Sequence, residues 1–108
     1  NPSTIVGTPA YMAPETAMDP AKVDLRADLY SLGCTAYHML TGRVPFEGRQ
    51  MLETIIKQVQ QHAVPVHLLD VAVPESLSKI VQKCMEKNPA DRFGSAGELA
   101  RALEALKF

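Results

Sequence analysis

The sequence predicts an all-α domain, and two observations support this fold class. Apolar residues recur at the three- and four-residue spacing of helices in several segments, and Pro, Gly and capping residues separate those segments. No segment shows a convincing alternation of apolar and polar residues of the kind that strands show. At 108 residues the chain is one domain or part of one. We expect four main helices and one short helix, without repeats or low-complexity tracts.

The N-terminal residues 1–11 are predicted to form a loop, because they lack a helical period and contain prolines and a glycine. Pro14 then suits the first turn of a short helix over residues 13–18, where its missing N–H leaves no bond unmade. Asp19 and Pro20 should end that helix.

The next helix, predicted over residues 25–41, is apolar on nearly all sides. Asp24 can cap its N-terminus and Gly42 can end it. One face carries Leu29, Leu32, Ala36 and Leu40. A helix that is apolar all round is a buried helix. If only this stretch of chain surrounds it, we expect exposed apolar surface and self-association.

Three further helices are predicted in the second half of the chain. Residues 49–61 form an amphipathic pattern, and residues 77–85 form the clearest one, which an Asn-Pro pair ends. Ser95 and Glu98 form a capping box ahead of the last helix. Residues 63–73 should be an ordered loop or a short helical turn. The apolar positions of the amphipathic pattern are Leu52, Ile55, Ile56 and Val59.

The composition argues against several classes of partner. With 11 basic and 12 acidic residues the net charge is −1, which gives no electrostatic reason to expect nucleic acid or an anionic membrane. No apolar run approaches the roughly 20 residues that cross a bilayer, so we expect a soluble, cytoplasmic protein. The chain starts at Asn1 inside a motif and without Met, which suggests a truncation.

The two cysteines are expected to be buried free thiols. Cys34 and Cys84 both lie in apolar helical patterns, where a thiol behaves as a small hydrophobic group. Cys34 and His38 share a helix face and could supply two metal ligands, but no second pair lies at ligand spacing. We therefore expect no metal site.

Three ordered motifs carry a resemblance to a known family. They are residues 7–15 (GTPAYMAPE), 28–33 (DLYSLG) and 88–93 (NPADRF), and together they resemble the C-terminal lobe of Ser/Thr protein kinases of the bacterial type. The Ala-Pro-Glu element belongs to a signature set whose glycine-rich loop, strand lysine, His-Arg-Asp and Asp-Phe-Gly members are not in this sequence. The resemblance implies an activation segment and substrate loop over residues 1–12 and a helical subdomain over residues 13–108.

The resemblance implies that Gly7, Thr8, Pro9 and Tyr11 line the site for the protein substrate. In the family, the threonine that matches Thr8 bonds the catalytic aspartate and a nearby lysine, and this pattern favours Ser/Thr over Tyr specificity. The local alternative is that Gly-Thr-Pro is turn chemistry, with Thr8 bonding its own backbone.

Three structural features are also implied. Glu15 should form a buried ion pair with Arg92, whose planar guanidinium can engage a carboxylate by two parallel bonds. Asp28 matches an aspartate that reaches backbone amides of the catalytic loop, and Thr4 lies where many such kinases are phosphorylated. The alternatives are that Glu15 and Asp28 are exposed carboxylates favoured by helix dipoles and that Arg92 is an exposed loop residue.

The function implied is therefore that of a fragment of a Ser/Thr protein kinase. The parent would transfer the γ-phosphoryl group of ATP, with magnesium, to a protein substrate. This chain contributes no catalytic residue and no ATP or metal ligand, so it should be inactive alone and dock on the rest of the kinase domain. The alternative is a freestanding, non-catalytic helical protein-interaction module or kinase remnant, binding through residues 8–11 and 49–61.

Overall fold

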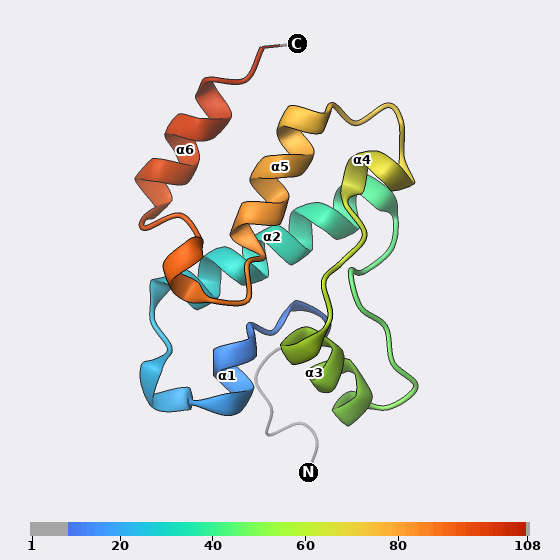
Figure 1. The fold of residues 1–108 in the computed structure, drawn as a ribbon, viewed down its shortest axis with the longest axis vertical. Coiled ribbons are helices and arrows are strands. Elements are labelled where there is room, and N and C mark those ends of the chain that lie inside the picture. Colours follow the sequence, from blue (N-terminus) through green and yellow to red (C-terminus); the bar gives the residue numbers. More distant parts are fainter. Residues whose placement is uncertain (1–8, 108) are drawn as a thin grey trace.

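The computed structural model describes residues 9–107, which form an all-α fold around a central helix, α2. Helices α5 and α6 lie on one side of α2, and α1 and α3 lie on the other (Figure 1). The expected fold class is confirmed. In chain order the elements are η2 (Pro9–Tyr11), α1 (Pro14–Met18), η3 (Pro20–Lys22), α2 (Leu25–Thr41), α3 (Met51–Gln60), α4 (Val66–Leu69), α5 (Glu75–Cys84), η4 (Pro89–Asp91) and α6 (Ala96–Glu104).

Local capping signals set the helix ends. The Asp24 carboxylate accepts a bond of 2.8 Å from the Arg26 amide at the start of α2, and Gly42 ends α2 with a positive φ of 76°. At the start of α6 the Ser95 hydroxyl accepts from the Glu98 amide at 3.1 Å. The return bond of this capping box is shifted, because the Glu98 carboxylate accepts from the Gly94 amide and not from that of Ser95.

The central helix α2 is buried on one side and apolar but exposed on another. Tyr30, Cys34 and Tyr37 are in the core, together with Leu29. Leu32, expected on the same face as Leu29, is instead 51% exposed and borders an apolar hollow between α2, α5 and α6. Burial raises the pKa of Cys34 to about 12, so this free thiol stays protonated at neutral pH.

Helix α3 departs in part from the usual arrangement of an amphipathic surface helix. Such a helix ordinarily buries its apolar stripe. Here Leu52 is 65% exposed and Ile56 is 44% exposed, whereas Thr54 and Gln58 on the opposite face are buried. Gln58 is buried on this face because its side chain bonds the N-terminal loop.

Helices α2 and α5 approach most closely at Gly33. A Cβ atom placed there would lie 2.7 Å from Cys84 Cβ and 2.9 Å from Met85 Cγ. Both distances are shorter than van der Waals contact, so only glycine fits without a shift of the two helices.

We expect Gly33→Ala to lower the free energy of unfolding by about 1–3 kcal/mol, because the added methyl group overpacks the contact of α2 with α5. Gly97→Ala is the matched control: Gly97 is exposed in α6, and its Cβ would meet atoms no closer than 3.4 Å. This control should raise stability by about 0.5–1 kcal/mol through helix propensity. Urea denaturation measures both. Equal effects of the two variants would contradict the close approach.

Candidate functional site

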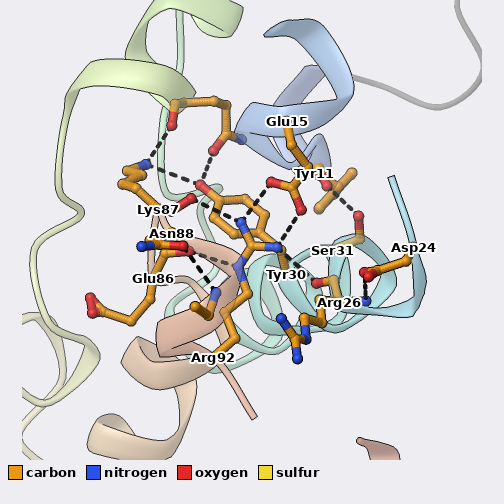
Figure 2. Close-up of polar contacts among 12 residues, drawn as sticks. Tyr11, Glu15, Asp24, Arg26, Tyr30, Ser31, Glu86, Lys87, Asn88 and Arg92 are labelled. Carbon is orange, nitrogen blue, oxygen red and sulfur yellow. Dashed lines mark hydrogen bonds and ion pairs between the residues drawn. The ribbon is translucent and has the colours of Figure 1, made fainter. Parts of the chain in front are cut away.

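Arg92 forms the centre of a buried polar cluster. Its side chain is 0% exposed, and Figure 2 shows it between the loop that follows α5 and the N-terminal ends of α1 and α2. Two of its N–H groups bond the Glu15 carboxylate, at 2.6 and 2.8 Å. The others donate to the carbonyls of Glu86 at 2.7 Å, Arg26 at 2.9 Å and Lys87 at 3.2 Å. All five donors of the guanidinium are therefore matched.

The partners explain why an arginine and not a lysine stands here. A lysine ammonium has three donors and no planar fork, so it would leave acceptors of this cluster without a bond. The Arg92 guanidinium carbon also lies 4.8 Å from the centre of the Tyr30 ring, within cation–π range. Glu15 is held in the first turn of α1, with its side chain 10% exposed.

A second buried cluster meets the first at Tyr30. Lys87 Nζ donates to the Tyr30 hydroxyl at 3.1 Å and to the main-chain carbonyl of Gln58 at 2.6 Å (Figure 2 shows Lys87 and Tyr30). The same ammonium lies 4.4 Å from the centre of the Phe46 ring. Burial lowers the pKa of Lys87 from 10.5 to about 8.

The main chain of the described part of the N-terminal loop is bonded to side chains of α2 and α3. These helices belong to the helical base, which is the helical part of the chain that follows the loop. The Gln58 carboxamide donates to the carbonyls of Pro9 and Ala10, at 3.1 and 2.8 Å. Ser31 Oγ donates to the carbonyl of Tyr11 at 2.6 Å. The Tyr11 hydroxyl lies 2.7 Å from His38 Nδ1, and the two rings stack.

The structure brings together some of the residues that the sequence singled out. Glu15 and Arg92 form the bidentate ion pair described above, and Pro9 and Tyr11 lie in the bonded loop. Asp28 is exposed on the first turn of α2, where the helix dipole favours a carboxylate. The predicted site residues Gly7 and Thr8, and the candidate phosphorylation site Thr4, lie outside the described residues.

Sequence reasoning missed Gln58, Lys87 and Ser31. Gln58 and Thr54 form an i, i+4 polar pair opposite the apolar stripe of α3, and such a pair is typical of a solvated face. Lys87 lies in a loop with no local signal. Sequence reasoning considered His38 as a metal ligand and gave it no other role, yet it bonds Tyr11 of the loop.

Residues 9–107 contain no group of three or more His, Cys, Asp or Glu side chains placed to hold a metal ion. Within the same range no helix combines the length and the apolar character that a bilayer span requires.

We expect Glu15→Gln to lower the free energy of unfolding by about 3–5 kcal/mol, because it leaves the buried Arg92 charge uncompensated. The matched control is Glu75→Gln, which breaks an ion pair with Lys79 whose side chains are 60% and 69% exposed. That control should cost less than about 1 kcal/mol. Chemical denaturation measures both, and a loss below 1 kcal/mol for Glu15→Gln would contradict the role of the pair.

The lowered pKa of Lys87 makes its contribution to stability depend on pH. The unfolded chain holds this proton up to about pH 10.5, whereas the folded chain releases it near pH 8. The folded chain binds this proton less tightly than the unfolded chain. The term that Lys87 adds to the free energy of unfolding is therefore at its full value above pH 10.5 and is lost as the pH falls through 8. The unfolding free energy of the wild type minus that of Lys87→Met should rise between pH 8 and 10.5. Gln82→Met, an exposed and non-titrating control, should give a constant difference. A constant difference for Lys87→Met would contradict the shift.

Comparison with known proteins agrees with the three motifs. Residues 1–105 match the family described as protein kinase domain. A probable serine/threonine-protein kinase of Clostridium perfringens is 37% identical over 105 residues, which are 97% of this chain and 15% of that protein. The serine/threonine-protein kinases PksC of Streptomyces coelicolor and PknB of Mycobacterium tuberculosis are 38% and 34% identical over 85% and 90% of this chain.

The chain spans about 15% of the length of these relatives. Three findings support one assignment. They are the helices around α2, the ion pair between the Ala-Pro-Glu motif and the loop before α6, and the family match over residues 1–105. The chain belongs to the protein kinase domain family and is a fragment of a kinase of the serine/threonine group.

Proposed function

We propose that this chain is the substrate-docking and supporting part of a kinase whose whole protein transfers the γ-phosphoryl group of ATP to Ser or Thr of a protein substrate. The observation that carries the proposal is the buried Glu15–Arg92 pair, which joins two of the family motifs across 77 positions of sequence. The pair anchors the loop that precedes α1 to the helical base.

Within this proposal, the N-terminal residues up to 12 supply the substrate loop and residues 13–108 supply its helical support. Gly7, Thr8, Pro9 and Tyr11 lie against the peptide substrate, and Thr8 bonds the catalytic aspartate. Support comes from the fixed main chain of Pro9 and Tyr11.

The proposal also gives roles to parts of the parent outside the described residues. Asp28 is exposed at the start of α2, and this placement leaves it open to catalytic-loop amides of the parent. ATP and magnesium bind elsewhere in the parent, so the fragment alone is inactive. Thr4 is the proposed phosphorylation site. The compartment we propose is the cytoplasm, where ATP is available.

The fragment alone should self-associate. The hollow between α2, α5 and α6 is lined by apolar residues, of which Leu32 is 51% and Leu103 is 43% exposed. Such a surface is normally covered in a soluble protein. In the parent we propose that the rest of the kinase domain covers it.

One observation favours a second function, a non-catalytic interaction module. Part of the apolar stripe of α3 faces outward, because Leu52 and Ile56 are exposed. A partner helix or loop could dock there without any chemistry in this chain.

We expect the whole protein that contains this chain to transfer labelled phosphate from ATP, with magnesium, to peptides of a library that contain Ser or Thr, and not to those that contain Tyr. The isolated 108-residue chain should show no ATP binding by calorimetry. Micromolar binding by the isolated chain would contradict the placement of the nucleotide site. A whole protein that transfers no phosphate would favour the interaction module.

A further inference from the structure

Gln58 is a buried polar residue on a helix whose apolar stripe is partly exposed. Its side chain is almost completely buried, at 1% exposed. Burial of a carboxamide is unfavourable unless its donors and acceptor are bonded. Here Nε2 donates to the carbonyls of Pro9 and Ala10, and Oε1 accepts from the Tyr30 hydroxyl. The whole carboxamide is therefore used.

The hydrogen bonds around Gln58 all donate in one direction, from Lys87 toward the loop. Lys87 donates to the Tyr30 hydroxyl, which donates to Gln58, which donates to the two loop carbonyls. If the carboxamide were rotated by half a turn, its oxygen would face two carbonyl oxygens. The network thus fixes which end of the Gln58 side chain meets the loop.

Three successive carbonyls of the loop are held by side chains of the helical base. Gln58 holds those of Pro9 and Ala10, and Ser31 holds that of Tyr11. The Pro9 carbonyl also accepts from the Met12 amide at 3.2 Å, so both of its lone pairs are engaged. The main-chain path of the loop is therefore set from beneath, by one residue of α3 and one of α2.

We propose that Gln58 is a positioning residue for the protein substrate. It sets the path of the loop against which the substrate residue after the phosphoacceptor lies, and thereby the KM for peptide. This inference rests on the proposed function. Because Gln58 is 1% exposed and bonds the loop carbonyls, we expect it to act on the peptide through the loop.

The test is Gln58→Glu in the whole protein. The probe is an unphosphorylated library peptide with a Ser or Thr that the wild type phosphorylates. The substitution keeps an oxygen for the Tyr30 hydroxyl but replaces the donor by an oxygen that faces two carbonyls. We expect the KM for this peptide to rise about tenfold or more, with kcat and the KM for ATP unchanged within about twofold. Hydrogen exchange of the loop amides should become faster.

Two further variants make the test specific. Gln60→Glu places the same charge at an exposed position of the same helix and should leave all three constants unchanged. Gln58→Met is similar in length, removes the donors and adds no charge, so it serves if the buried carboxylate prevents folding. It should raise the KM for peptide in the same way.

A folded, active Gln58 variant with an unchanged KM for peptide would overturn the inference. So would a fall in kcat that follows the loss of folded protein, with no change in KM, because that is the result of a purely structural role. A wild-type protein that transfers no phosphate would contradict the proposed function instead.

Discussion

The fold depends on one buried cation with a complete set of partners. Arg92 reaches the first turn of α1, the first turn of α2 and its own preceding loop, and each of its donors meets an oxygen. A charge taken out of water is tolerated only when it is paired and bonded in this way. All of these segments must therefore be in place together. The cluster fixes how these segments lie relative to one another more than it adds net stability.

Tyr30 connects the Arg92 cluster to the loop that precedes α1. The face of its ring lies against Arg92, and its hydroxyl joins Lys87 to Gln58. Burial raises the pKa of this hydroxyl, so it stays protonated and able to donate at physiological pH. A single side chain of α2 thus contacts both the ion pair and the group that holds the loop carbonyls.

The sequence predicted the parts of this structure that depend on neighbouring residues. The caps at Asp24 and Ser95 and the end of α2 at Gly42 are local, because each involves bonds within a few positions. Glu15 and Arg92 lie far apart in the chain and were related only through motifs of a known family. Gln58 and Lys87 could not be found, because their partners lie 28 to 57 positions away and no local pattern marks them.

The burial of Gln58 and the exposure of Leu52 and Ile56 change which positions of α3 tolerate substitution. Hydropathy assigns the apolar residues of a surface helix to the protected side and the polar ones to the variable side. In α3, Leu52 and Ile56 are exposed, whereas the buried Gln58 bonds the backbone of a distant loop. Replacing the exposed apolar residues of this helix to improve solubility should leave the loop in place. Replacing Gln58 by a better helix former would instead release the carbonyls of Pro9 and Ala10.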